Sequence, residues 1–280
     1  MTRLQISPIQ GRQRQMRSLL RTIWPRSGDH VPSVLVLTPV KNASKHLPGY
    51  VDRIRSLQWP RTRLRLGMLE SDSEDGTWEQ LRAIERKLSK SVSRVTLVKR
   101  DFGYKIPEGM PRWQPEIQMD RRCILAKARN QLLFRALQDE DWVLWLDVDV
   151  IDYPRDIIKK LIAFGLDIVH PHCVTQAGGR TFDRNAWSHH GSRTLEDMRG
   201  NSVVPLDSVG GTMLLVRADR HRDGLVFPPF RYGVDNPRAR PSHPDWGKGE
   251  IETEGLGIMA LDMGLQCWGL PDLEIIHANE

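Results

Sequence analysis

The chain has 280 residues, 39% hydrophobic and 27% charged, with a formal net charge of +6, which is typical of a soluble globular protein. Its apolar runs are far shorter than the roughly 20 residues that span a bilayer, and the first residues lack the pattern of a secretory signal, so we expect an intracellular, cytoplasmic protein. Three cysteines without metal-ligand spacing predict reduced thiols rather than a disulfide framework or a zinc site.

The positive charge is concentrated at the amino terminus. Residues 1–28 contain six arginines and no acidic residue, and the remaining 35 basic residues equal the 35 acidic ones. A broad nucleic-acid-binding surface is therefore not expected. Residues 12–24 also carry apolar side chains at helical spacing. We predict that residues 1–30 form a basic amphipathic arm, which either contacts a membrane surface peripherally or packs on the domain or on a second subunit of a homo-oligomer.

From residue 31 to residue 150 the chain alternates predicted strands and helices. The strands are predicted over residues 34–37, 64–70 and 94–99, and the helices over residues 46–57, 78–88 and 120–137. Thr77 and Gln80 predict a capping box for the second helix. This alternation predicts an α/β fold with a parallel sheet, right-handed crossovers and functional loops at one edge.

An Asp-x-Asp motif ends the apolar run of residues 142–150. The run predicts a strand buried on both faces. Side chains alternate along a strand, so Asp147 and Asp149 would point to the same side at its carboxyl end. Two carboxylates there are well placed to hold a divalent cation against a substrate phosphate. By itself, the motif is equally compatible with a strand that is followed by an acidic turn.

Two arginines share one stripe of the predicted helix 120–137. Arg122 and Arg129 flank Ala126, and two guanidiniums separated by a small side chain can bind a diphosphate in bidentate fashion. From this helix alone, a solvated face is the simpler interpretation.

Residues 151–280 show less periodicity. One helix is predicted over residues 154–164, and residues 250–255 lead into another that ends near residue 263. Strands are predicted over residues 167–169, 213–217 and 265–268. Residues 172–205 are predicted to form an irregular excursion or lid, and residues 275–277 a tail. Since no repeat, low-complexity block or linker is visible, we predict a single merged domain over residues 31–280.

Six short motifs occur in the order of one known family. They are Thr38-Pro39-Val40-Lys41-Asn42-Ala43, Ser71-Asp72-Ser73-Glu74-Asp75-Gly76-Thr77, Ala126-Lys127-Ala128-Arg129-Asn130, Asp147-Val148-Asp149-Val150, Val209-Gly210-Gly211-Thr212 and Glu252-Thr253-Glu254-Gly255. On these motifs the chain, over roughly residues 33–277, resembles the fungal Golgi alpha-mannosyltransferases that form the mannan polymerase complexes. The resemblance implies a GT-A fold, with a nucleotide-binding half (residues 31–150) and an acceptor half (residues 151–280). It also implies retaining transfer of mannose from GDP-mannose with Mn²⁺ or Mg²⁺.

The same resemblance implies roles for particular residues. The implied metal site contains Asp147, Asp149 and His277, with Asp147 contacting the donor ribose or reaching the metal through water. Thr38, Pro39 and Asp72 would contact the nucleoside, and Arg122 and Arg129 the diphosphate. Without the family, His277 would be interpreted as a solvated tail residue.

Three acidic residues are catalytic candidates. Asp207, Glu252 and Glu254 would line the sugar and acceptor pocket, where a carboxylate could stabilise an oxocarbenium-like state. A departing phosphate oxygen can itself accept the proton of the acceptor hydroxyl. Alternatively, Glu252 and Glu254 would be favourable charges at a helix amino terminus.

The chain also departs from the family. The fungal members have an amino-terminal transmembrane helix where this chain has an arginine-rich arm, which suggests a soluble, non-fungal relative. Residues 232–249 match nothing in the family, so the glycan, glycolipid or other hydroxyl acceptor stays open, and a UDP-sugar donor is an alternative. One rival interpretation is a catalytically silent scaffold or carbohydrate-binding subunit of a glycosyltransferase complex. Another is a haloacid dehalogenase-type phosphatase, whose first Asp is a nucleophile but whose motif follows the first strand.

Overall fold

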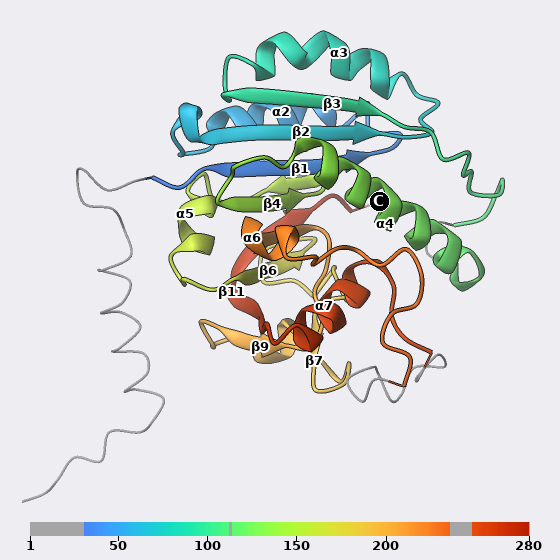
Figure 1. Ribbon diagram of the computed structural model, residues 1–280, viewed down its shortest axis with the longest axis vertical. Coiled ribbons are helices and arrows are strands. Elements are labelled where there is room, and N and C mark those ends of the chain that lie inside the picture. The colour runs from blue at the N-terminus through green and yellow to red at the C-terminus, as the bar shows by residue number, and fades with distance from the viewer. Residues whose placement is uncertain (1–30, 112–113, 236–247, 280) are drawn as a thin grey trace, which may run out of the picture.

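The computed structural model describes residues 31–111, 114–235 and 248–279 (Figure 1). In chain order the strands are β1 (Val34–Val40), β2 (Leu64–Glu70), β3 (Arg94–Lys99), β4 (Trp142–Leu146), β5 (Val150–Asp152), β6 (Ile168–Val174), β7 (Trp187–Ser188), β8 (Arg193–Thr194), β9 (Val204–Leu206), β10 (Met213–Arg217) and β11 (Cys267–His277). The helices are α2 (Leu47–Ser56), η1 (Arg61–Arg63), α3 (Thr77–Leu88), α4 (Pro115–Ala136), α5 (Ile157–Ile162), η2 (Glu196–Met198), α6 (Ala218–Arg222) and α7 (Glu252–Asp262).

One mixed sheet organises the described residues. Its strand order is β3-β2-β1-β4-β10-β6-β11-β5, and β9 also pairs with β11. The predicted parallel arrangement is confirmed for β3, β2, β1 and β4, whereas β10 runs antiparallel to both β4 and β6. β11 is parallel to β6 and antiparallel to β5. Both halves of the chain therefore contribute strands to the same sheet, and the α/β expectation is confirmed.

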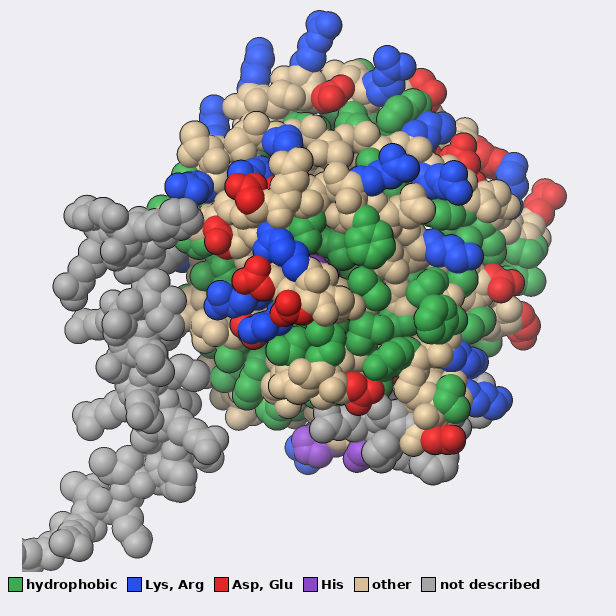
Figure 2. Space-filling view, viewed as in Figure 1, with side chains coloured by type: hydrophobic (Ala, Val, Ile, Leu, Met, Phe, Trp, Pro, Cys, Tyr) green, Lys and Arg blue, Asp and Glu red, His purple; other side chains and the backbone are tan. Residues whose placement is uncertain are grey.

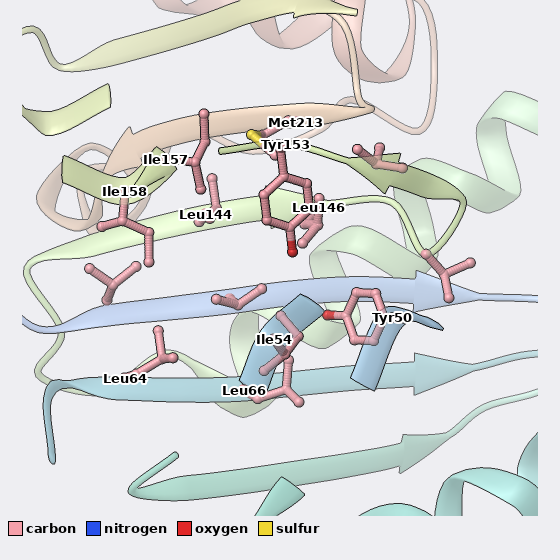
Figure 3. Packing of buried hydrophobic residues seen from close by; sticks show 14 of the residues in the cluster. Tyr50, Ile54, Leu64, Leu66, Leu144, Leu146, Tyr153, Ile157, Ile158 and Met213 are labelled. Atoms are coloured by element: carbon pink, nitrogen blue, oxygen red, sulfur yellow. The ribbon is translucent and has the colours of Figure 1, made fainter. Parts of the chain in front are cut away.

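The side chains of β1 alternate between two hydrophobic cores. Val34 and Val36 belong to the core under α2, α3 and α5, whereas Leu35 and Leu37 belong to the core under α4, α6 and α7. All four side chains are fully buried, as expected for a strand with helices on both faces. Figure 3 shows part of the first core, where side chains of α2 and α5 pack on β1, β2 and β4.

The absence of a side chain at Gly67 lets α4 approach the sheet closely. A Cβ atom at this position of β2 would lie 2.7 Å from Leu37 Cδ2, 3.0 Å from Ala136 Cβ and 3.3 Å from Leu132 Cδ1. Such contacts are shorter than close packing allows. Gly67 thus fixes the depth of α4, the helix that carries Arg122 and Arg129.

The predicted capping box at α3 is wrong. Thr77 is the first residue of the helix, and Gly76 precedes it with a φ of +78° and no side-chain cap. The Thr77 hydroxyl donates to the Asp75 carboxylate and accepts from Ala43 N–H at 2.8 Å. The threonine therefore ties α3 to the loop after β1 instead of closing the helix end.

Other predicted boundaries are also corrected. α4 begins at Pro115 and α5 at Ile157, so the proline of Asp152-Tyr153-Pro154 lies before its helix and not in it. The stretch predicted as irregular contains the end of β6 and the β7–β8 hairpin, followed by η2 and β9. The predicted tail is the end of an 11-residue strand, β11.

Three further expectations concern the surface and the thiols. Cys123, Cys173 and Cys267 are free, as predicted. Within the residues described, no helix has both the length and the apolar character needed to cross a bilayer. The amphipathic arm predicted over residues 1–30 lies outside the described residues.

The face drawn in Figure 2 carries side chains of both charges, with Lys and Arg projecting over α3.

Candidate functional site

Side chains from segments far apart in the sequence line one cavity of about 800 Å³. This volume lies within the range of small-molecule sites. The lining includes Arg122, Arg129, Asp147, Asp149, Phe182, Asp183, Gly211, Thr212, Glu252, Glu254 and His277. Seven of the residues singled out from the sequence therefore share this one cavity.

A turn, and not the predicted strand, presents the two aspartates. β4 ends at Leu146, and Asp147, Val148 and Asp149 lead into the separate strand β5. The Asp147 N–H donates to the Thr212 carbonyl at 2.9 Å, which ties the turn to the start of β10. Both carboxylates line the cavity, as predicted. They do so because the chain turns after β4, and not because side chains alternate along a strand.

His277 reaches this turn through the pairing of β11 with β5. Its register partner is Val150, and its Nε2 lies 3.1 Å from Asp149 Oδ1. A carbonyl can only accept, so the 2.7 Å contact with Ala278 O assigns a proton to Nδ1. The Phe182 ring stacks on the imidazole at 3.9 Å. The interpretation of His277 as a solvated tail residue is therefore wrong, since the side chain is buried.

The charges around the turn shift two ionisation equilibria. Burial raises the pKa of Asp147 to about 6, against the opposing effect of Arg129 and with a further increase from Asp149. Burial disfavours the charged form of His277, but its contact with Asp149 outweighs this effect and raises the pKa of the imidazole.

The two arginines of α4 are paired with glutamates of α7. Arg129 Nε lies 3.0 Å from Glu252 Oε1, and Arg129 Nη2 lies 3.1 Å from Asp147 Oδ1. Arg122 Nη1 lies 2.8 Å from Glu254 Oε2. Arg129 is 3% exposed, so a solvated face is the wrong interpretation of this stripe. In this network, Arg129 Nη1 has no hydrogen-bond partner among the described residues.

Glu252 adopts a backbone conformation that is unfavourable for a side chain. Its φ is +58°, in the left-handed region, and its N–H donates to Pro228 O at 2.9 Å. Such strain persists where the surrounding structure enforces it, often at functional sites. The carboxylate of Glu252 forms an ion pair with Arg129 and that of Glu254 with Arg122, and Glu254 also accepts a hydrogen bond from Trp187 Nε1 at 2.8 Å. Both glutamates therefore lie in the first turn of α7, as the alternative interpretation expects, and in addition form specific ion pairs.

Four other candidates lie outside the cavity lining. The Thr38 hydroxyl is buried and bonds the Tyr50 hydroxyl at 2.6 Å, and Pro39 is its neighbour in β1. Asp72 accepts hydrogen bonds from the N–H groups of Phe102 and Gly103, so its carboxylate orders the loop after β3. The Asp207 carboxylate accepts from His190 N–H at 3.2 Å. The structure gives no support for a direct role of these side chains in this cavity.

Sequence reasoning missed Phe182, Asp183 and Thr212 as cavity residues. Phe182 and Asp183 lie in the stretch predicted to be irregular, where no periodicity marked them. Asp183 accepts hydrogen bonds from Thr212 N at 3.1 Å and Thr212 Oγ1 at 2.9 Å. Burial alone would raise the pKa of Asp183, but the neighbouring His170 and these donors outweigh it and lower the pKa. The Gly210-Gly211-Thr212 motif was the one available signal.

Asp149 and His277, two of the predicted metal ligands, are close enough to bind the same cation at adjacent coordination positions. Ligand atoms at right angles around Mn²⁺ or Mg²⁺ lie about 3 Å apart, and Asp149 Oδ1 and His277 Nε2 are separated by 3.1 Å. Carboxylate oxygen suits both ions, and the imidazole nitrogen favours a transition-metal ion such as Mn²⁺ over Mg²⁺. Asp147 is turned toward Arg129, and no three acidic, His or Cys side chains of the described segments surround a single point. The residues fit a cation that is completed by ligands from a bound substrate.

Comparison with known proteins gives one family and several relatives. The model of the family described as Anp1 matches residues 22–199 and 192–231. The mannan polymerase II complex anp1 subunit of Schizosaccharomyces pombe is 29% identical, and the match covers 91% of this chain and 66% of that protein. The mannan polymerase complex subunit MNN9 of Candida albicans is 28% identical, with coverages of 88% and 75%. The chain thus spans about two thirds to three quarters of the length of these two relatives.

A solved structure shares the fold. It is a mannosyltransferase from Pyrobaculum calidifontis in complex with GDP-Man and Mn²⁺, with a TM-score of 0.55 and 18% sequence identity. The similarity covers 94% of this chain and 62% of that one. The fold is accordingly of the GT-A type, with the Asp-x-Asp motif after β4. This placement removes the haloacid dehalogenase interpretation, which requires the motif after the first strand.

Proposed function

The chain belongs to the Anp1 family, and we propose that it is a metal-dependent, retaining glycosyltransferase that moves mannose from GDP-mannose to a hydroxyl of a glycan or glycolipid. The observation that carries the proposal is the pair of Asp149 and His277, 3.1 Å apart. This pair shares a cavity of about 800 Å³ with the buried Arg129.

The proposed donor and metal are supported by the comparison with known proteins. A protein of the same fold was solved with GDP-Man and Mn²⁺, and two relatives are named as subunits of mannan polymerase complexes. The residues fit this chemistry, because a carboxylate and an imidazole suit Mn²⁺ and a guanidinium suits a phosphate.

Each residue of the site has a separate task in the proposed reaction. Asp149 and His277 hold the cation, with Asp147 beside them. A bound Mn²⁺ or Mg²⁺ would stabilise the negative charge that develops on the departing diphosphate. Arg129 lines the cavity, and its guanidinium would bind a phosphate oxygen there.

Glu252 and Glu254 act as positioning residues in this proposal. Their carboxylates fix Arg129 and Arg122 in the cavity wall, so that the guanidiniums need not reorganise when the substrate binds. In a retaining front-face reaction the departing phosphate oxygen can take the proton of the acceptor hydroxyl. No separate base is then needed, and Asp207 has no part in the step.

A second candidate function is a catalytically silent subunit of a glycosyltransferase complex. It is favoured by the arginine pairing, because Arg122 and Arg129 each face a glutamate that competes with a phosphate for the guanidinium. The two candidates differ in whether the cavity binds and cleaves a nucleotide sugar.

Thermal unfolding with Mn²⁺ and GDP or UDP tests the proposal. We expect GDP with Mn²⁺ to raise the melting temperature, and Asp149→Asn and His277→Gln to abolish this shift. Asp152→Asn is the matched control, because Asp152 is an exposed acid on the neighbouring strand β5.

Product analysis completes this test. Released mannose from GDP-mannose should be the α anomer when it is observed immediately by NMR. Stabilisation by GDP without any turnover, with or without glycan acceptors, would favour the silent subunit. An unchanged melting temperature with every nucleotide would contradict both the donor and the metal assignment.

A further inference from the structure

Asp183 is a buried carboxylate of the cavity wall that the proposed reaction does not use. Its side chain is 6% exposed, and that exposed part lines the cavity. The preceding residue, Phe182, stacks on His277 at 3.9 Å. Asp183 therefore enters the cavity beside the pair that is proposed to hold the cation.

Thr212 holds one oxygen of this carboxylate and leaves the other largely available. Asp183 Oδ2 accepts from Thr212 N at 3.1 Å and from Thr212 Oγ1 at 2.9 Å. Oδ1 accepts a long hydrogen bond, 3.3 Å, from Asn185 N. Each carboxylate oxygen can accept about two hydrogen bonds, so Oδ1 can accept a further one. Thr212 O also accepts from Asp147 N, which links Asp183 rigidly to the aspartate turn.

The Gly210-Gly211 pair makes room for opposite charges on its two sides. A Cβ at Gly210 would lie 2.0 Å from Asp183 Oδ2, and one at Gly211 would lie 2.5 Å from Arg129 Nη2. The absence of side chains at these two positions therefore lets the Asp183 carboxylate and the Arg129 guanidinium pack directly against the backbone. The hydrogen-bond acceptor Asp183 and the cationic Arg129 thus contact adjacent residues of the cavity wall.

A fully buried imidazole stands behind the carboxylate. His170 Nε2 lies 3.5 Å from Asp183 Oδ2, and neither ring nitrogen makes a hydrogen bond that meets ordinary geometry within the described residues. Under-satisfied buried polar groups are rare and require a reason. The Asp183 carboxylate faces this imidazole through Oδ2, so the long hydrogen bond from Asn185 N is the only one that Oδ1 accepts within the described residues.

We propose that Asp183 accepts a hydrogen bond from a hydroxyl of the donor's hexose and so determines which sugar is bound. The inference rests on the proposed function, which places the diphosphate at Arg129 and at the cation held by Asp149 and His277. The sugar attached to that diphosphate must then lie in the remaining part of the cavity. A fixed carboxylate oxygen is a strong acceptor for a hydroxyl and gives a charge-assisted hydrogen bond.

Calorimetric titration in the presence of Mn²⁺ tests this role without turnover. The measured quantity is the ratio of the Kd for GDP to the Kd for GDP-mannose, which isolates the contribution of the sugar. Asp183→Asn should reduce this ratio by about tenfold or more, and leave the Kd for GDP unchanged. Asp197→Asn is the matched control, because Asp197 accepts from Thr194 N and Oγ1 in the same way but is exposed, in the short helix η2. It should change neither value.

A second measurement uses the unaltered protein and is independent of how the variant folds. Among the 2-, 3-, 4- and 6-deoxy analogues of GDP-mannose, one should bind about tenfold more weakly than GDP-mannose. In Asp183→Asn this difference should disappear. Equal binding of all four analogues, or an unchanged GDP to GDP-mannose ratio in Asp183→Asn, would overturn the role of Asp183. Failure of the unaltered protein to bind GDP with Mn²⁺ would instead overturn the proposed function.

Discussion

Arg129 Nε lies 3.0 Å from Glu252 Oε1, and this ion pair joins α4 to α7 with both side chains buried. The helices come from opposite halves of the chain, and a charge on either one would be costly in the interior without its partner. The pair therefore links the packing of the two halves to the shape of the cavity.

Removal of one partner should be more costly than removal of both. Arg129→Met leaves Glu252 with Arg122 Nε at 3.7 Å as its remaining cation in the described network, so we expect a loss of about 3 kcal/mol in the free energy of unfolding. A cycle with Glu252→Gln should give a coupling energy of at least about 1 kcal/mol by urea unfolding. The exposed pair of Arg55 and Asp52 provides the control cycle, where the coupling should be below about 1 kcal/mol. Additive effects at Arg129 and Glu252 would contradict the buried pair.

The left-handed conformation of Glu252 should reverse the usual preference for alanine over glycine. Glycine adopts a φ of +58° without strain, so Glu252→Gly should be more stable than Glu252→Ala by about 1 kcal/mol, although both lose the ion pairs. Arg82, an exposed residue of α3, is the control position. There, alanine should be the more stable by about 1 kcal/mol, as in an ordinary helix interior. The same order at both positions would show that Glu252 is not strained.

Gly210→Ala should destabilise the protein through its contact with Asp183. The new Cβ would lie 2.0 to 2.4 Å from the carboxylate atoms, and overpacking of this kind costs about 1–3 kcal/mol. In an Asp183→Ala background the contact is gone, and the cost of Gly210→Ala should fall by at least half. Chemical unfolding of the four proteins of this cycle measures both values. If Gly210→Ala lowered the free energy of unfolding equally in both backgrounds, its contact with Asp183 would not be the reason why residue 210 is glycine.

His221 should make stability fall as the pH is lowered from 6.5 to 4. Burial lowers the pKa of this imidazole to about 4, and its nitrogens bond Trp145 Nε1 and Leu225 O. Between the unfolded pKa of about 6.5 and the folded value, the unfolded chain binds a proton that the folded protein does not. The contribution is therefore fully present above about pH 6.5 and decreases by about 3 kcal/mol by pH 4.

His221→Gln isolates this contribution, because an amide can accept from Trp145 and donate to Leu225 without titrating. Urea unfolding at pH 7 and pH 4.5 should show a smaller loss for the variant than for the unaltered protein. Parallel losses in both proteins would assign the acid sensitivity to other groups.

Strands with strong local patterns were predictable from the sequence. The bounds of β2, β3 and β10 agree with the expected ranges, since apolar runs flanked by turn residues are local signals. The strand before the Asp-x-Asp motif was expected to continue to residue 150, because a periodic pattern cannot show where the backbone turns. β4 ends four residues earlier, at Leu146.

By itself, the sequence determined the α/β class, the core strands and a set of motifs in family order, because each is encoded in contiguous residues. Only the tertiary structure decided that His277 lies on Asp149, that the arginines of α4 face the glutamates of α7, and that Asp183 joins the same cavity. These relationships depend on the pairing of β11 with β5 and on the packing of α4 against α7. The ion pairs join residues more than a hundred positions apart, and Asp183 comes from a stretch without periodicity. None of these contacts leaves a pattern in the local sequence.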